Sequence, residues 1–159
     1  MTLPQLHAFS FEASNVFGDV KRSSRRFVWY LATPYSSTDA EVRALRADLA
    51  TRATASLLCG GLSAYSPIAA HHPVSLKMVR EKEPTHAEWM EICYAMLDRC
   101  DGLIVSTMDG SRQSAGVTLE IQRWYERRDE RNLLYASPIR VNEPWTPRFS
   151  ISRLAVDGL

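Results

Sequence analysis

The sequence lacks several features that would assign it to a class at once. No apolar run approaches the length of a membrane-spanning helix, and the first 26 residues lack the continuous apolar core of a signal peptide. Its 19 basic and 18 acidic residues give a formal net charge of +1, so bulk charge favours neither nucleic acid nor an acidic membrane surface as a partner. We therefore expect a cytoplasmic protein whose ligands must be inferred from individual sites.

Cysteine is also scarce. Cys59, Cys93 and Cys100 are odd in number and show no CxxC spacing, which is typical of small buried side chains in a reducing compartment. His71 and His72 are adjacent but lack the ligand spacing of a zinc site. We expect neither a metal nor a cofactor.

Three common motifs are missing as well. The chain contains no GxGxxG, no GxxxxGK[ST] and no GxSxG, which removes the usual dinucleotide, nucleoside triphosphate and serine-hydrolase interpretations. What is present is ordinary for one globular domain, with 159 residues, 45% of them hydrophobic and 23% charged.

Strand-like and helix-like segments alternate along this domain. Short apolar runs typical of strands occupy residues 27–35, 62–68, 101–108 and 132–137. Helical patterns occupy residues 36–61, 85–100 and 113–128, the first two with the capping-box pairs Thr38 with Glu41 and Thr85 with Glu88. This order predicts an α/β fold with a central parallel sheet covered on both faces.

The remaining segments show no clear period. Residues 69–84 are polar and bounded by proline, so we expect a long loop that could serve as a lid. We interpret residues 1–26 as an N-terminal arm, residues 27–140 as the α/β domain and residues 141–159 as a C-terminal tail.

One carboxylate lies inside an apolar stripe. In the segment 113–128, Val117, Ile121 and Trp124 recur at helical spacing, and Glu120 falls between them. Ser114 can cap this helix and Gly116 can allow close approach of a ligand. The helix N-terminus favours an ionised carboxylate, which could act as a nucleophile; the alternative is a Glu paired in the core or leaning out of the stripe.

Other candidates follow from where ligands bind in open α/β sheets, beyond the carboxyl ends of the strands. Tyr30 lies within the first strand, where a buried phenol needs a hydrogen-bond partner that Glu120 could supply. Asp101 begins the third strand and could act as an acid, although an Asp before a Gly is commonly a turn residue.

The stretches WYLATPYSS (29–37), CDGLIV (100–105) and SAGVTLE (114–120) together resemble the nucleoside 2-deoxyribosyltransferase superfamily, which includes the 2′-deoxynucleoside 5′-monophosphate N-glycosidases. The resemblance spans about residues 27–136 and is nearest to a phage and bacterial branch without an assigned function. It implies a flavodoxin-like three-layer fold, a homo-oligomer, and cleavage of an N-glycosidic bond through a covalent deoxyribosyl enzyme.

Residue by residue, the resemblance places the nucleophile on Glu120, the strand tyrosine on Tyr30 and the aspartate beside the base on Asp101. Where the transferases carry an Asp, this chain has Ser114, as the monophosphate hydrolases do. That favours a nucleotide over a free nucleoside, and hydrolysis over base exchange. The chain departs from the superfamily in its first loop, where Thr33 and Pro34 replace glycine.

We therefore expect Glu120, Asp101 and Tyr30 to be catalytic, and the substrate, a small nucleoside or nucleotide, to be bound by Ser114, Gly116, Thr33, Tyr35 and His71. Tyr35 could stack on the base. Two alternatives stay open: a non-catalytic nucleotide-binding module on the same fold, and a glycosidase that acts on ribonucleotides or NAD.

Overall fold

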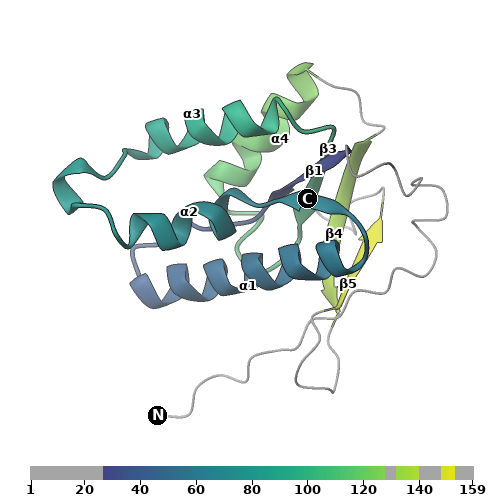
Figure 1. Cartoon of the computed structure of the whole chain (residues 1–159), viewed down its shortest axis with the longest axis horizontal. Helices are drawn as coiled ribbons and strands as arrows, with labels where there is room; N and C mark the ends of the chain where they lie inside the picture. The colour runs from purple at the N-terminus through teal and green to yellow at the C-terminus, as the bar shows by residue number, and fades with distance from the viewer. Residues whose placement is uncertain (1–26, 128–131, 140–147, 153–159) are drawn as a thin grey trace, which may run out of the picture.

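The computed structural model describes residues 27–127, 132–139 and 148–152 (Figure 1). The expected N-terminal arm lies outside the described residues, as does most of the expected C-terminal tail. The strands are β1 (Val28–Ala32), β2 (Ser63–Tyr65), β3 (Gly102–Ser106), β4 (Leu133–Ile139) and β5 (Arg148–Ser152). The helices are α1 (Ala40–Cys59), α2 (Pro67–Ser75), α3 (His86–Leu97) and α4 (Ala115–Arg127), with a 3₁₀ turn, η1, at Arg80–Lys82.

The strands form one sheet in the order β2-β1-β3-β4-β5. The first four are parallel, and β5 pairs with β4 in the antiparallel direction. Strand β1 lies between β2 and β3. The chain leaves β1 in one direction to form β2 and then crosses back to form β3 on its other side, so the strand order reverses between β1 and β3.

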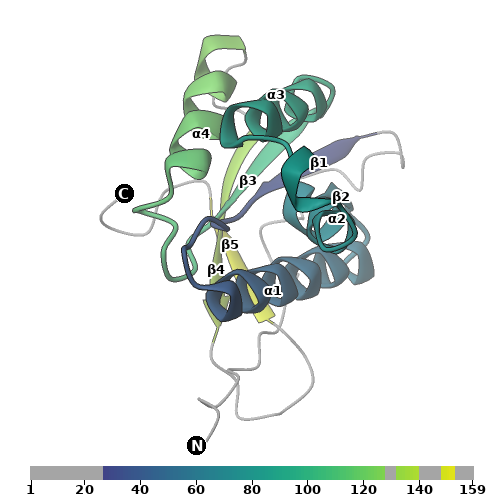
Figure 2. The same ribbon diagram turned by 90° about the vertical axis from the view of Figure 1, so that its left-hand side faces the viewer.

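Helices cover both faces of the sheet, which gives the expected flavodoxin-like α/β/α arrangement (Figure 2). On one face, Leu31 and Ile104 pack with Leu57 of α1. On the other, Tyr30 and Leu103 pack with side chains of α3 and α4 such as Trp124. Side chains of a parallel strand alternate between the two faces, so the continuously apolar runs of β1 and β3 are those of strands buried on both sides.

The two sheet-centre strands approach each other closely at Gly102. A Cβ atom at this position would collide with the indole ring of Trp29, which is paired with Gly102 in the register of β1 and β3. Glycine is therefore required here by packing against the Trp29 ring.

The helix caps agree in part with the sequence. Thr85 and Glu88 form the predicted capping box of α3. The predicted box at the start of α1 is wrong: Asp39 is the N-cap, and its carboxylate accepts a hydrogen bond of 2.8 Å from the backbone N–H of Glu41. Asp39 directly precedes the first residue of α1, so its side chain can reach the free N–H groups of the first turn.

The prediction of a loop over residues 69–84 is wrong for residues 69–75, which are helical. Pro67–Ser75 is helix α2, capped by the Ser66 hydroxyl, which accepts from the backbone N–H of Ala69. Pro67 occupies the first helical turn, where no N–H is needed. Helix α2 shows no clear period in the sequence because it is short and contains Pro73.

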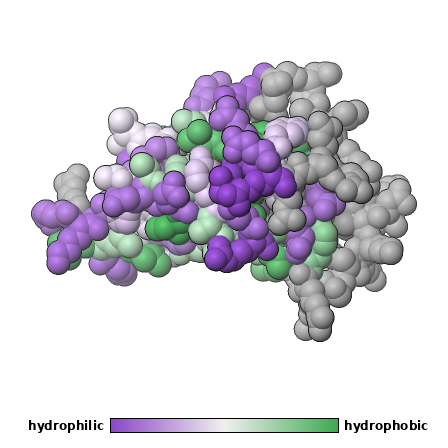
Figure 3. All heavy atoms as spheres, turned by 90° about the horizontal axis from the view of Figure 1, so that it is seen from above, coloured by the Kyte–Doolittle hydropathy of each residue, from purple (hydrophilic) through white to green (hydrophobic). Residues whose placement is uncertain are grey.

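The C-terminal segment contributes β5, a strand that the sequence did not predict as part of the sheet. In the described part of the chain, no helix combines the length and apolarity needed to cross a bilayer. On the face seen in Figure 3, hydrophilic and hydrophobic residues are interspersed.

Candidate functional site

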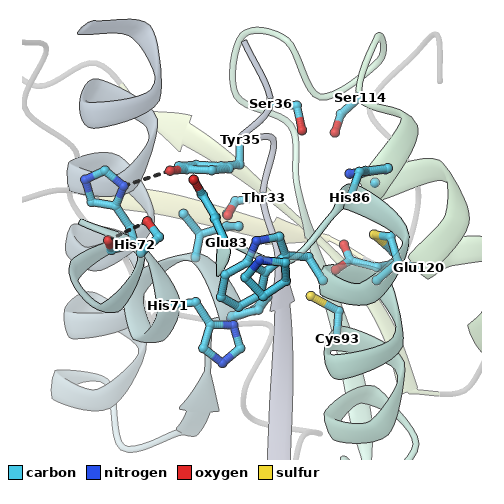
Figure 4. A pocket seen from close by; sticks show the side chains of 17 residues that line it. Thr33, Tyr35, Ser36, His71, His72, Glu83, His86, Cys93, Ser114 and Glu120 are labelled. Carbon is cyan, nitrogen blue, oxygen red and sulfur yellow. Dashed lines mark hydrogen bonds between the residues drawn. The ribbon is translucent and has the colours of Figure 1, made fainter. Parts of the chain in front are cut away.

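A cavity of about 250 Å³ lies beyond the carboxyl end of β1, beside the point where the strand order reverses (Figure 4). Ligands of open α/β sheets bind at this place. Six of the eight residues predicted from the sequence line the cavity: Thr33, Tyr35, His71, Ser114, Gly116 and Glu120. These six predicted residues therefore come together in one cavity, whose walls also include residues that the sequence did not indicate.

Glu120 is the buried carboxylate of this cavity. It lies on α4 and is only 5% exposed. The hydroxyl of Tyr30, which is fully buried in β1, donates a hydrogen bond of 2.5 Å to Glu120 Oε1. The predicted partnership between these two residues is confirmed, and it fixes the direction of the carboxylate at the cavity wall.

Burial sets the charge of this pair. It raises the pKa of Glu120 to about 8, an effect that the hydrogen bond from Tyr30 partly offsets. The pKa of Tyr30 is raised well above its usual value by burial and by the nearby Glu120 charge. Below pH 8 the carboxyl group is therefore mostly protonated.

Burial therefore opposes the ionised form of Glu120 that the helix N-terminus was expected to favour. Helix α4 begins at Ala115, so Glu120 lies in its second turn. The favourable effect of the helix dipole falls off within the first turn, whereas loss of hydration acts on the whole carboxylate.

Cys93 lies beside this pair and was not predicted as a site residue. It is buried on α3 and lines the cavity, with its sulfur on the same side as the Glu120 carboxylate in Figure 4. Burial, and next the charge of Glu120, raise the pKa of its thiol to about 11. The thiol therefore stays protonated and can donate a hydrogen bond but is a poor nucleophile.

Aromatic rings form the wall contributed by α2 and α3. The rings of His71 and Trp89 lie 5.3 Å apart at an interplanar angle of 31°. The Tyr35 hydroxyl and His72 Nδ1 are 2.9 Å apart, and the Tyr65 hydroxyl and His71 Nε2 are 3.4 Å apart. Flat, polarisable surfaces of this kind suit stacking on a planar heterocycle.

Hydroxyl groups also line the cavity. Thr33 and Ser36 follow β1, and Ser114 precedes α4, where its hydroxyl accepts from the backbone N–H of Val117 at 3.3 Å. Ser36 and Ser114 both appear at the top of the view in Figure 4. The predicted cap by Ser114 is confirmed, and the helix N-terminus beside it favours an anionic group.

Arg46 holds the two loops that carry these hydroxyls. Its guanidinium donates to the backbone carbonyl of Ser36 at 2.6 Å and to that of Tyr35 at 3.4 Å. The same group lies against Gly110 of the loop between β3 and α4, where φ is +90°. One side chain of α1 thereby connects both loops of the cavity.

Asp101 is not part of this site. Its carboxylate accepts a hydrogen bond of 2.9 Å from the backbone N–H of Val28, and its own N–H donates to the Val28 carbonyl. Val28 begins β1, whereas the cavity lies beyond the end of that strand, so Asp101 stands at the opposite edge of the sheet. This position does not support the predicted role of Asp101 beside the base. The residue instead links the starts of β1 and β3 by hydrogen bonds.

The sequence did not indicate Trp89, Cys93 or His72 as site residues. Helical periodicity places Trp89 and Cys93 on the core face of a helix, and His72 falls in a segment without a clear period. The signal that could have found them is their position on helices that follow the second strand and precede the third. Among the residues that the structure describes, no group of three or more His, Cys, Asp or Glu side chains could hold a metal ion.

Comparison with known families adds one result. Residues 27–137 match a family model described as a domain of unknown function, DUF1937. The matched region runs from the residue before β1 into β4 and contains every lining residue named above. A search of curated proteins finds no match.

Proposed function

The chain belongs to the DUF1937 family of domains of unknown function, and from its cavity we propose that it cleaves or transfers the N-glycosidic bond of a nucleoside or nucleoside 5′-monophosphate through a glycosyl-Glu120 intermediate. The observation that carries the proposal is the buried Glu120 carboxyl group, held by Tyr30 in the lining of a cavity that also contains aromatic rings and hydroxyl groups. Such a cavity suits a ligand with a flat base and a polar sugar.

In the proposed reaction, ionised Glu120 attacks the anomeric carbon while the bond from that carbon to the base nitrogen breaks. The base leaves with the bonding electron pair and takes a proton from water or from a cavity group. Water or a second base then displaces the carboxylate from the glycosyl ester, as in retaining glycosidases. Tyr30 orients the carboxylate in both steps.

We propose a substrate orientation from the rings and hydroxyl groups of the cavity lining. The base stacks against His71 and Trp89, and the sugar lies toward Thr33 and Ser114. A 5′-phosphate would meet the N-terminus of α4, although none of the lining residues within the described chain is Lys or Arg. Hydrolysis of both nucleosides and monophosphates should therefore be tested.

The test is chromatographic detection of free base from a panel of deoxyribonucleosides, ribonucleosides, their 5′-monophosphates and NAD. Wild-type protein should release base from at least one of them, and Glu120→Ala should abolish release while the circular dichroism spectrum stays unchanged. Unchanged turnover by folded Glu120→Ala protein would exclude Glu120 as the nucleophile.

The pKa of Glu120 favours one second candidate. A carboxyl group protonated at neutral pH can donate a hydrogen bond to a bound nucleotide without reacting, as in a non-catalytic nucleotide-binding module. In that case calorimetry would detect nucleotide binding, and no member of the panel would lose its base over long incubation.

From the sequence resemblance we further propose that the protein acts in the cytoplasm as a homo-oligomer. Light scattering coupled to size exclusion measures the oligomeric state, and a monomer at all protein concentrations would contradict that part of the proposal.

A further inference from the structure

One buried hydroxyl group of the cavity has no partner within the described residues. Thr33 follows the last residue of β1 and is 5% exposed, and its Oγ1 atom makes no hydrogen bond there. The same residue lines the cavity, on the wall between Tyr35 and Glu120 in Figure 4. A hydroxyl that is removed from water and left unpaired destabilises the protein unless a ligand supplies the missing partner.

The position of Thr33 is what points to a ligand. Ser111 has a second buried hydroxyl without a partner in the described structure, but Ser111 does not line the cavity. Comparing the two residues therefore distinguishes the effect of a buried unpaired hydroxyl on stability from an effect on ligand binding. Of these two residues, only Thr33 belongs to the lining of the cavity.

The chemistry of the surroundings identifies the ligand group. Thr33, Ser36 and Ser114 contribute hydroxyl groups to the cavity lining, and His71 and Trp89 contribute a pair of rings. A planar base fits the rings, which leaves the sugar toward the end of β1. A sugar hydroxyl both donates and accepts hydrogen bonds, as the Thr33 hydroxyl does.

We propose that Thr33 Oγ1 binds a secondary hydroxyl of the substrate's sugar and makes this cavity selective for sugars that carry one there. The proposal rests on the proposed function for the nature of the ligand. It adds a specificity-determining contact that involves no bond making or breaking.

The experiment compares Thr33→Val, which replaces the hydroxyl by a methyl group at nearly the same shape, with Thr33→Ser, which keeps the hydroxyl. Ser111→Ala is the matched control, because it removes the other unpaired hydroxyl away from the cavity. Calorimetry measures the Kd of the nucleoside or nucleotide that wild-type protein binds best, of its 2′,3′-dideoxy counterpart, and of the free base. Thermal unfolding measures the stability of each ligand-free variant.

We expect Thr33→Val to raise the Kd of the hydroxylated ligand about 10- to 100-fold, because the sugar hydroxyl loses its partner in a buried site. The Kd of the dideoxy ligand and of the free base should change by less than about twofold, which is below the effect of one hydrogen bond. Thr33→Ser and Ser111→Ala should keep wild-type binding, and Tm of ligand-free Thr33→Val should not fall.

Equal Kd values for Thr33→Val and wild type, or an equal loss for all three ligands, would overturn the inference. Its failure is distinguishable from failure of the proposed function. If Glu120→Ala still releases base but Thr33→Val loses hydroxyl-dependent binding, only the catalytic assignment fails. If no nucleoside, nucleotide or base binds wild-type protein, both are overturned.

Discussion

The Tyr30 hydroxyl and the Glu120 carboxylate meet at 2.5 Å although 90 residues separate them in the chain. Strand β1 brings the phenol from inside the sheet, and α4 brings the carboxyl group from the layer above. The hydrogen bond stabilises the ionised form of Glu120, whereas burial stabilises the neutral form, and burial has the larger effect. The balance between these two forces gives the site its pH dependence.

Replacing Tyr30 by Phe should move that balance. Loss of the hydrogen bond raises the pKa of Glu120 further, because this bond is what lowers it. At pH 7 we expect kcat/KM to fall about 10- to 100-fold, since a hydrogen bond to a charged group contributes about 1.5–3 kcal/mol. The measurement is kcat/KM against pH for both proteins.

The midpoint of the pH profile of kcat/KM distinguishes a change in the pKa of Glu120 from a general loss of activity. The pH at which kcat/KM reaches half its maximum should be higher for Tyr30→Phe than for wild type. A uniform loss of activity with the midpoint unmoved would mean that Tyr30 does not tune the Glu120 carboxyl group.

Stability should depend on pH through the same residue. The pKa of Glu120 is raised from 4.5 to about 8 on folding, so between these values the unfolded chain releases a proton that the native protein keeps. The contribution is fully present below pH 4.5 and is lost as the pH rises through about 8. Between these two pH values the free energy of unfolding therefore falls by at most about 1.4 kcal/mol for each unit of rising pH.

The control for this prediction is Glu120→Gln, which is neutral at every pH. Urea unfolding from pH 5 to pH 8 should show stability falling more steeply for wild type than for Glu120→Gln. Parallel curves for the two proteins would contradict the buried, neutral state of Glu120.

Two glycines test how Arg46 holds the cavity loops. Gly110 and Gly61 have φ values of +90° and +86°, so alanine is strained at either position. A Cβ atom at Gly110 would also collide with the Arg46 guanidinium, whereas at Gly61 it would meet nothing within 4 Å. Gly61→Ala should therefore cost about 1–2 kcal/mol of unfolding free energy, and Gly110→Ala should cost more.

Ligand binding separates the same two variants. Gly110→Ala should also weaken nucleotide binding measured by calorimetry, because displacement of Arg46 releases the carbonyl groups of Tyr35 and Ser36. Gly61→Ala should bind as wild type does. Equal Kd values for both variants would show that Arg46 does not position the site.

Asp101→Ala tests the reassignment of that residue. Removing the carboxylate leaves the backbone N–H of Val28 without its acceptor, which should cost about 1–3 kcal/mol of unfolding free energy. The kcat of the folded variant should stay within about twofold of wild type, an effect smaller than general acid catalysis supplies. A kcat loss of about 100-fold in folded protein would restore Asp101 to the reaction.

The sequence predicts the fold well because its signals are local. The apolar runs of β1 and β3 and the capping box of α3 are complete within a few residues, and they appear in the structure as predicted. Helix α2 was missed because a short helix with Pro73 inside it shows no helical period. Strand β5 was missed because its pairing with β4 is a long-range feature.

The candidate site was predictable only where a residue conflicts with its local pattern. Glu120 stands out as a carboxylate within an apolar stripe, and Tyr30 as a phenol within a buried strand. Cys93 and Trp89 fit the apolar face of α3 and carry no such conflict, so the sequence pattern alone does not separate them from core residues. The raised pKa of Glu120 is likewise a property of burial that helix position alone does not indicate.

The most direct test of the central claim is mass spectrometry of the protein quenched with acid during turnover of the best substrate. A peptide containing Glu120 should carry the mass of the substrate's glycosyl group in wild-type protein, and the same peptide from Glu120→Gln should be unmodified. Release of base by Glu120→Gln at the wild-type rate, with no glycosyl group on Glu120 in wild type, would contradict the account.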